Sequence, residues 1–441
     1  MISNLNFKTG KINKSILRLA VPAILNNITV PLLGICDTAV SGHLGSAAYI
    51  GAVAVGAMML NVIFWLSGFL RAGTTALVSN AFGAGDMGVA VNVSKKAFVI
   101  VSAISGMLLL AYPFIGEFLI DIISPQDETR HLALQYYNIC VWSVPAQLGV
   151  MVVSGWFIGM QNTVVPMFVA IGMNIVNIVM SLIYVFPMKM GFSGIALGTL
   201  TANWIGFATA LLYMIAKIRK LPKNGGKVKW HRFFSVNSNL FMRSFCIMGV
   251  TMAVTSYGAR LGDTVLAVNA VMMQFFIFFS YFMDGFAFAG EALVGKASGE
   301  KNIQRLHATT RALLLWGAGM ASAFFIIYLF AGSHIAGLIT DSADVCMGVA
   351  EMHLWVVLLP PVTVAAFLFD GIFIGLTRTR MLFLTTLLAA AIFFAITLPF
   401  DIKGGFNNNI LWLAFECYLL IRGLSLAICY AHLGVRLTSH L

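Results

Sequence analysis

The sequence contains few charged residues, and acids are especially scarce among them. Only 10% of its 441 residues are charged, and just 16 residues are Asp or Glu. Soluble domains carry about 25% charged residues. Because a water-soluble surface cannot be built from so few charges, the composition excludes a chain of soluble domains.

Cysteine and histidine are sparse as well. The six cysteines fall mostly inside apolar runs without paired spacing, and the eight histidines are scattered. Neither pattern is typical of a disulfide framework or a zinc site, so we interpret the cysteines as packing residues. Since no nucleophile-and-base or metal constellation stands out either, we expect neither an enzyme nor a bound cofactor.

Long apolar runs are what the sequence has in abundance. Hydrophobic residues make up 60% of the chain, and its mean hydropathy is +0.91. A transmembrane helix needs about 20 apolar residues, and the runs predict an all-α polytopic membrane protein with twelve such helices. The predicted spans are 15–40, 47–71, 91–116, 132–158, 162–187, 193–216, 238–260, 264–290, 308–331, 346–372, 381–400 and 409–431.

The basic residues predict the orientation in the membrane. They crowd the N-terminal tail and the even-numbered loops, namely Lys8, Lys11, Lys14, Lys95, Lys96, Lys296, Lys301, Arg305, Arg311, Arg378 and Arg380. By the positive-inside rule both termini are cytoplasmic, and we expect a multi-pass protein of the plasma (inner) membrane. This placement also argues against a nucleic-acid partner, although the formal net charge is +11.

A polar and basic stretch at the midpoint divides the chain into two halves. It runs over 217–232 and contains a proline and two adjacent glycines, which indicate irregular backbone. We therefore predict an N-lobe over 1–216, a basic cytoplasmic linker over 217–237 and a C-lobe over 238–441. Each lobe would hold six spans.

The two halves repeat each other in a constant register. Gly155 recurs as Gly371, 216 positions later. Further matches at this offset are Tyr112 with Tyr328, Phe114 with Phe330, Gly116 with Gly332, Pro145 with Pro361, Phe157 with Phe373 and Gly159 with Gly375. Repeated halves are typical of secondary transporters, whose substrate site lies between them near the membrane midplane. The alternative is an old duplication retained only for packing.

Five acids lie within apolar runs of the sequence. A carboxylate inside the membrane costs roughly 2.5–3.5 kcal/mol to insert and is functional by default. Asp37 has no basic residue near it in the sequence to neutralise it. An arriving H⁺ or Na⁺ would relieve the cost of burying its charge. The alternative is that Asp37 lies at the end of a span and faces water. The other four acids are Asp284, Glu291, Asp370 and Glu416.

The fifth predicted span carries polar residues on one helical face. Asn174, Asn177 and Ser181 stand at positions i, i+3 and i+7. Because oxygen ligands of this kind suit a hard cation, they form a candidate cation-coupling site together with Asp37. The alternative is that these side chains only link helices by hydrogen bonds.

The second half lacks the asparagine pair of the first. It carries instead Asp284 and Glu291, two helical turns apart on one face, and Asp370 within the repeated glycine motif. Different acids in related halves suggest a division of labour, and we predict that these three bind substrate or protons. Glu416 has no assigned role, and a hydrogen bond to a neighbouring helix is one interpretation.

Two glycine-rich segments resemble nucleotide-binding loops. Residues 290–297 are one residue short of a phosphate-binding loop, and Gly83, Gly85 and Gly88 fit the pattern GxGxxG. Neither lies in an expected βαβ unit, so we interpret both as turns where a span leaves the membrane. No ATP-driven mechanism is expected.

Two prolines interrupt the first span upstream of Asp37. Pro22 and Pro31 each remove a backbone hydrogen bond and permit a kink. A helix that bends beside an ion-binding carboxylate is a candidate switch, and static kinks are the alternative.

These motifs give the chain a family resemblance. It resembles the multidrug and toxic compound extrusion (MATE) family, and within it the DinF branch. The matching stretches are Leu19–Pro22, Asn27–Gly34, Asp37–Val40, Ala52–Gly56, Ala81–Ala84, Ala267–Ala270, Asp284–Ala287 and Asp370–Gly375. The resemblance runs over nearly the whole chain.

The resemblance implies a twelve-helix exporter with two pseudo-symmetric six-helix lobes and alternating access. Such proteins exchange H⁺ or Na⁺ for lipophilic, often cationic compounds. Carried over to this sequence, the N-lobe cation site uses Asp37, Asn177 and Thr199, with Na⁺ as one candidate ion and bending at Pro22. Ser181 stands where the branch has a second Asp, so the coupling ion and its stoichiometry stay open.

We therefore expect a monomeric secondary active antiporter that exports lipophilic, cationic small molecules. The nearest alternative is a flippase for lipid-linked precursors. A cavity rich in Arg or Lys would favour a flippase, and Arg422 is the main basic residue deep in a predicted span. A channel is less consistent with the sequence, because too few polar residues are present to line a continuous pore.

Overall fold

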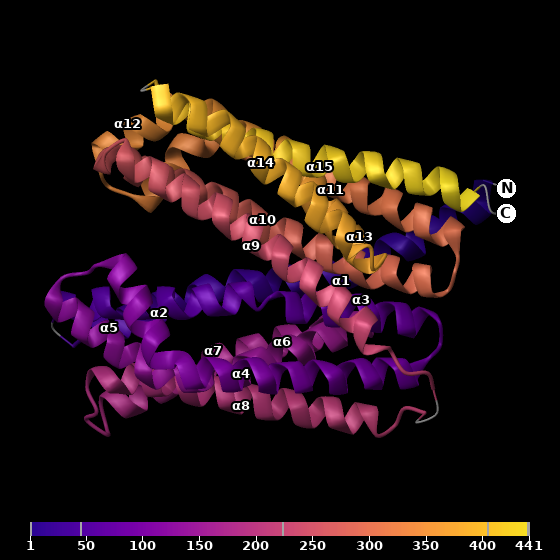
Figure 1. The fold of residues 1–441 in the computed structure, drawn as a ribbon, viewed down its shortest axis with the longest axis horizontal. Coiled ribbons are helices and arrows are strands. Elements are labelled where there is room, and N and C mark those ends of the chain that lie inside the picture. Colours follow the sequence, from indigo (N-terminus) through magenta and orange to yellow (C-terminus); the bar gives the residue numbers. More distant parts are fainter. Residues whose placement is uncertain (1, 45, 223–224, 404, 439–441) are drawn as a thin grey trace. The chain divides into compact units, whose positions relative to one another are not determined.

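The chain is helical throughout the part that the structure describes. The computed structural model covers residues 2–44, 46–222, 225–403 and 405–438, and within these every side chain except those of 2–9, 30–33, 35, 47, 403 and 433–438. These residues form fifteen α-helices and one short 3₁₀ helix, without a β-strand (Figure 1). The predicted all-α class is confirmed.

The helix bounds follow the apolar runs. The helices of the first half are α1 (Ile2–Gly42), α2 (Ala47–Leu66), α3 (Phe69–Gly83), α4 (Met87–Ile123), α5 (Asp127–Cys140), the 3₁₀ helix η1 (Val141–Ser143), α6 (Val144–Gly159), α7 (Val164–Val185) and α8 (Phe192–Ile218). Those of the second half are α9 (Trp230–Arg260), α10 (Asp263–Gly299), α11 (Ile303–Ile339), α12 (Ala343–Glu351), α13 (His353–Gly375), α14 (Thr379–Lys403) and α15 (Asn408–Thr438).

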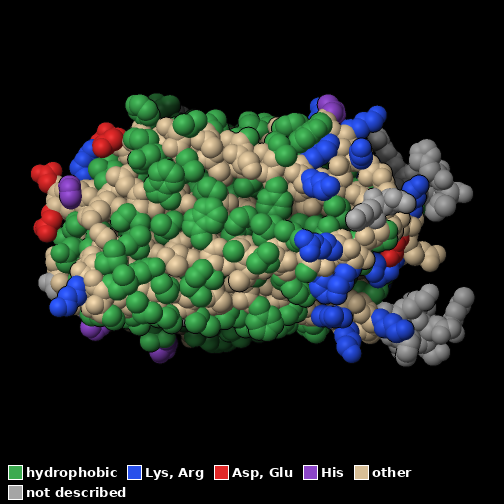
Figure 2. Space-filling view, turned by 90° about the horizontal axis from the view of Figure 1, so that it is seen from below, with side chains coloured by type: hydrophobic (Ala, Val, Ile, Leu, Met, Phe, Trp, Pro, Cys, Tyr) green, Lys and Arg blue, Asp and Glu red, His purple; other side chains and the backbone are tan. Residues whose placement is uncertain are grey.

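Eleven segments of the described chain are long and apolar enough to cross a membrane. Two of them join successive helices, α2 with α3 and α5 with α6. The first predicted span, 15–40, lies in α1, and it includes residues 30–33 and 35, whose side chains are outside the description. With α1 the layout agrees with twelve spans. Figure 2 shows hydrophobic side chains over much of the visible surface, with Lys and Arg side chains mostly away from its middle.

The helices form two compact units. One consists of Leu25–Phe233, and the other joins Met1–Ile24 to Phe234–Leu441. This division differs from the predicted lobes at the N-terminus, because the first 24 residues group with the second half. The boundary falls two residues after Pro22, within α1. The hinge at Pro22 stays a prediction, and the side chain of Pro31 lies outside the description.

The internal repeat is visible as equivalent helix contacts inside the two units. A Cβ on Gly155 of α6 would lie 2.4 Å from the carbonyl oxygen of Arg71, and one on Gly371 of α13 would lie 2.3 Å from that of Ala287. Arg71 and Ala287 are themselves 216 positions apart. Only glycine lets the helix backbones approach so closely, which explains why the motif stands in both halves.

The two glycine-rich segments have different structures. The turn predicted for Gly83 and Gly85 is confirmed, because α3 ends at Gly83 and Gly85 adopts a φ of +73°. The prediction is wrong for Gly88, which lies in the first turn of α4. The turn predicted over 290–297 is wrong, because α10 continues as a helix to Gly299. Gly290 instead lies where α10 packs against α13. A Cβ on Gly375 of α13 would lie 3.1 Å from the Gly290 carbonyl oxygen.

Candidate functional site

The predicted coupling carboxylate is buried. Asp37 on α1 is only 5% exposed. The Tyr136 hydroxyl and the Cys140 thiol, both on α5, lie within electrostatic reach of its carboxylate. Among the described residues no cationic side chain forms an ion pair with it. A buried charge without a counter-charge is costly in a membrane, so Asp37 is a candidate for binding a cation or a proton.

Helices α5, α7 and α8 bring three polar side chains together. Asn177 Nδ2 donates a hydrogen bond to Thr199 Oγ1 at 2.9 Å, and the Tyr136 hydroxyl lies 3.4 Å from the same oxygen. The Thr199 hydroxyl in turn donates to the carbonyl oxygen of Ile195 at 3.3 Å. The Tyr136 hydroxyl therefore lies near the Thr199 hydroxyl and within electrostatic reach of Asp37.

Two further oxygens in this region are available to a ligand. Asn177 Oδ1 and Ser181 Oγ are buried and have no hydrogen-bond partner within the described part of the chain. Each unsatisfied buried oxygen costs about 1–3 kcal/mol, which a bound cation would recover. One carboxylate with neutral oxygens suits a hard ion such as Na⁺. The described residues include no group of three His, Cys, Asp or Glu side chains that would hold a transition metal.

Asn174 has a different partner from its neighbours on α7. Its Nδ2 donates to the carbonyl oxygen of Thr29 on α1 at 2.9 Å. This is the helix-linking role that the sequence left open as the alternative. Asn174 therefore ties α7 to the helix that carries Asp37 through its amide nitrogen, and its Oδ1 takes no part in this bond.

The candidate site depends on a close contact between α7 and α8. A Cβ on Gly198 would lie 2.1 Å from Ser181 Oγ and 2.8 Å from the Ser181 nitrogen. We expect Gly198→Ala to force the two helices apart and to lower the free energy of unfolding by about 1–3 kcal/mol. Thermal unfolding in detergent measures this loss.

The matched control for that substitution is Gly172 on the same helix as Ser181. A Cβ on Gly172 meets no atom within 4 Å. Gly172→Ala should be neutral or stabilise the helix by roughly 0.5–1 kcal/mol. Equal effects of the Gly172 and Gly198 substitutions would contradict the close packing described here.

The second half carries a buried ionic cluster. Arg243 on α9 and Arg422 on α15 both donate from Nη2 to the same oxygen, Asp370 Oδ2 on α13. The side chains of Asp370 and Arg422 are each 7% exposed, and that of Arg243 is 15% exposed. Two cations thus share one carboxylate, and the cluster carries a net charge of about +1.

The polar atoms of this cluster are not all satisfied. Asp370 Oδ1 and the Nε atoms of Arg243 and Arg422 are buried without a hydrogen-bond partner in the described residues. Because its charge is already compensated twice, Asp370 is poorly suited to binding a cationic substrate directly. The excess positive charge suits an anionic group instead.

The other acids of the second half lie elsewhere on its helices. Asp284 and Glu291 are on α10, where Asp284 is half-buried and Glu291 is 1% exposed. Glu416 on α15 is 5% exposed, and its Oε1 lacks a hydrogen-bond partner in the described part. The hydrogen bond to a neighbouring helix that the sequence suggested for Glu416 is thus missing for this oxygen. Its burial makes it a further candidate for protonation.

Three residues of these sites were missed by the sequence reasoning. Tyr136 and Cys140 were indistinguishable from core residues of an apolar run. Arg243 lies inside the predicted span 238–260, where an arginine is as costly as an acid. That cost alone would have singled out Arg243 as a partner for a buried carboxylate.

The chain is similar to known membrane proteins along most of its length. The MatE family model matches residues 22–183 and 240–399. The DNA damage-inducible protein F of Escherichia coli (strain K12) is 36% identical over 424 residues, which cover 94% of this chain and 91% of that protein. The probable multidrug resistance protein NorM of Idiomarina loihiensis is 22% identical over 348 residues, covering 76% of this chain and 74% of that one.

Solved structures share the fold. The crystal structure of a MATE protein in its bent conformation superposes with a TM-score of 0.86 at 16% sequence identity. The match covers 98% of this chain and 97% of that one. The fold is therefore shared, although few residues are identical.

Proposed function

Because this chain belongs to the MatE family of transporters, we propose that it is a secondary active antiporter exporting lipophilic small molecules in exchange for H⁺ or Na⁺. The observation that carries the proposal is the buried Asp37 carboxylate, without a counter-charge in the described residues and close to Tyr136. Multidrug resistance proteins among the relatives support an efflux role. Both termini would face the cytoplasm, as the basic loops predict.

The residues around Asp37 have distinct roles in this proposal. Asp37 supplies the negative charge that binds one H⁺ or Na⁺. Asn177 Oδ1 and Ser181 Oγ are neutral ligands that complete a Na⁺ shell, and Thr199 holds the Asn177 amide in place through its hydrogen bond. With one carboxylate the site neutralises a single positive charge, so one ion would enter in each cycle.

The driving force sets the expected size of the substrate gradient. One charge moving inward gains roughly 2.3 kcal/mol per 100 mV, which sustains an export gradient of about fiftyfold for a neutral substrate. For a monovalent cation exchanged one for one, the potential term cancels. Only the chemical gradient of the ion then drives export.

Counter-transport in liposomes tests this function. Purified protein is reconstituted, pH and Na⁺ gradients are imposed separately, and uptake of cationic dyes is followed. We expect an inward gradient of one ion to drive dye against its own gradient, and an ionophore that collapses the gradient to stop it. Dye uptake that is the same with and without either gradient would contradict ion coupling.

A second candidate function is the transport of anionic amphiphiles such as lipid-linked precursors. The observation that favours it is the net positive cluster of Arg243, Asp370 and Arg422. The net positive charge would repel a cationic substrate, whereas an anionic head group would find two guanidinium groups. In the same liposomes, bile acids or a fluorescent anionic lipid replace the dyes. Movement of the anions alone would favour this second function.

A further inference from the structure

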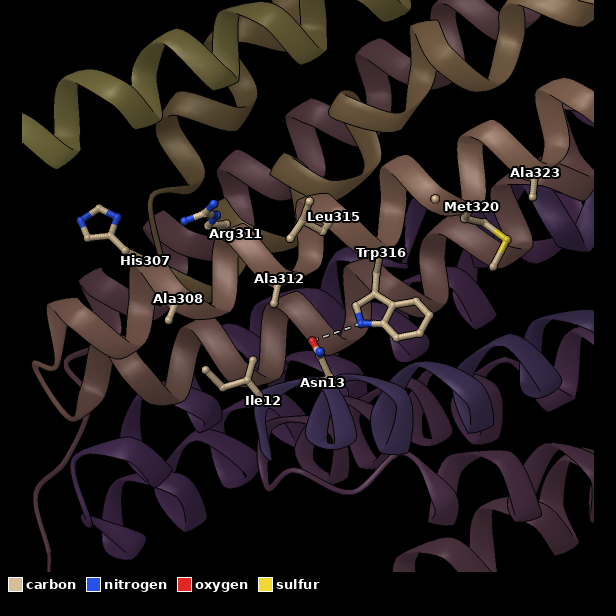
Figure 3. A pocket seen from close by; sticks show the side chains of 11 residues that line it. Ile12, Asn13, His307, Ala308, Arg311, Ala312, Leu315, Trp316, Met320 and Ala323 are labelled. Atoms are coloured by element: carbon tan, nitrogen blue, oxygen red, sulfur yellow. Dashed lines mark hydrogen bonds between the residues drawn. The ribbon is translucent and has the colours of Figure 1, made fainter. Parts of the chain in front are cut away.

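A groove of about 940 Å³ opens between the first part of α1 and α11, and it has no role in the function proposed above (Figure 3). Both helix segments belong to the unit that joins Met1–Ile24 to Phe234–Leu441. Asn13 stands on the α1 side, and the α11 side extends from His307 to Ala323. Trp316 Nε1 donates to Asn13 Oδ1 at 3.3 Å and links the two walls.

The lining changes from polar to apolar along α11. His307 and Arg311 lie near the start of the helix, and Leu315, Met320 and Ala323 follow (Figure 3). From Arg311 to Ala323 the helix rises about 18 Å. One leaflet of a bilayer has about 15 Å of hydrocarbon. The groove thus has the length and polarity of one phospholipid, with the head group at the start of α11.

The charges at the polar end have one sign. The sequence contains no Asp or Glu before Asp37, and α11 contains none over its whole length. Arg305 is paired with Glu300 at 3.0 Å. Arg311 forms no ion pair with any described residue, although it is exposed at the groove. Its guanidinium is therefore free to bind a phosphate group.

The position of the groove fits the inner leaflet. The basic residues before and within the first turns of α11 mark this end as cytoplasmic by the positive-inside rule. Trp316 lies close to this end, and tryptophan is enriched where hydrocarbon meets head groups. Anionic lipids are concentrated in the cytoplasmic leaflet. A neutral or zwitterionic lipid would leave Arg311 without a net counter-charge.

We propose that this groove is a binding site for an anionic phospholipid of the cytoplasmic leaflet. The head-group phosphate binds Arg311, and an acyl chain lies along Leu315 and Met320. The groove shares no residue with the ion site at Asp37, so this proposal does not depend on the proposed transport function.

Quenching of Trp316 by brominated lipids tests the proposal directly. Full-length protein is placed in nanodiscs that contain brominated phosphatidylglycerol or brominated phosphatidylcholine at equal mole fraction. The chain has eight tryptophans, and the difference between wild type and Trp316→Phe isolates the Trp316 signal. We expect the anionic lipid to quench this signal with about fivefold higher apparent affinity, as one cation at a membrane surface provides.

Arg311→Gln should remove that preference, and Arg380→Gln should retain it. Arg380 is an exposed cation at the start of α14, outside the groove. Equal quenching by both lipids in the wild type, or a preference that survives Arg311→Gln, would overturn the proposal.

A second measurement needs no tryptophan substitution. Phosphatidylglycerol added to detergent-solubilised wild type should raise the thermal midpoint, and this rise should be lost in Arg311→Gln but not in Arg380→Gln. Inorganic phosphate alone should leave the midpoint unchanged. A rise with phosphate alone would show that the site binds free anions and would overturn the lipid assignment.

Discussion

Asp37→Asn is expected to abolish ion-coupled efflux while the protein still folds. Asparagine keeps the size of the side chain but cannot carry the charge that binds H⁺ or Na⁺. Losing about 3 kcal/mol of ion binding lowers the occupancy of the site by more than about 100-fold. Transport of a dye driven by an imposed ion gradient in proteoliposomes measures this loss. Because a buried charge disappears, the thermal midpoint should stay the same or rise.

The matched control is an aspartate that faces solvent. Asp121 on α4 has a side chain that is 65% exposed and pairs with Arg130 at 2.7 Å. An exposed pair contributes about 0–1 kcal/mol, so Asp121→Asn should leave both coupling and stability unchanged. Undiminished coupled transport by folded Asp37→Asn protein would remove Asp37 from the mechanism.

The fold could be predicted because the bilayer restricts what a spanning segment can be. Backbone groups in hydrocarbon must be bonded within a helix, so each apolar run of sufficient length gives one span. Interruptions inside a run were harder to find. Helices α2 and α3 are separated at Ser67 and Gly68, but the residues on both sides of this break are mostly apolar. Hydropathy alone therefore did not predict the break, and the predicted span ended at 71, within α3.

The division of α1 between two units could not be predicted from hydropathy either. The first part of α1 packs against α10, where a Cβ on Gly285 would lie 2.9 Å from the Ala20 carbonyl oxygen. That contact joins residues far apart in the sequence. The internal repeat did not predict this contact, because it matches sequence positions in the two halves and carries no information on which helices touch.

The candidate sites could likewise be predicted only in part. Spacing along one helix placed Asn177 and Ser181 on a common face, and the structure adds Thr199 and Tyr136 through hydrogen bonds from other helices. The cluster at Asp370 depends on arginines 127 and 52 positions away. Local periodicity predicts which residues share a face, whereas pairing across three helices requires the tertiary structure.

The cluster of Arg243, Asp370 and Arg422 is the feature whose disruption should cost the most stability. It joins α9, α13 and α15 at a single carboxylate oxygen. Removing one member has different consequences depending on which charge is lost. Without Arg422 a neutral pair remains, and the loss is about that of one charged hydrogen bond, roughly 1.5–3 kcal/mol.

Asp370→Asn, in contrast, leaves two buried guanidinium groups without a counter-charge, and we expect it to lower the free energy of unfolding by about 3–5 kcal/mol. Denaturant unfolding in mixed micelles measures the difference between variants. The double variant Asp370→Asn with Arg422→Gln should be more stable than Asp370→Asn alone, because only one unpaired charge stays buried. If the second substitution lowers stability further instead, the two arginines do not repel each other. The net positive charge that favours anionic substrates would then be neutralised by a group outside the cluster.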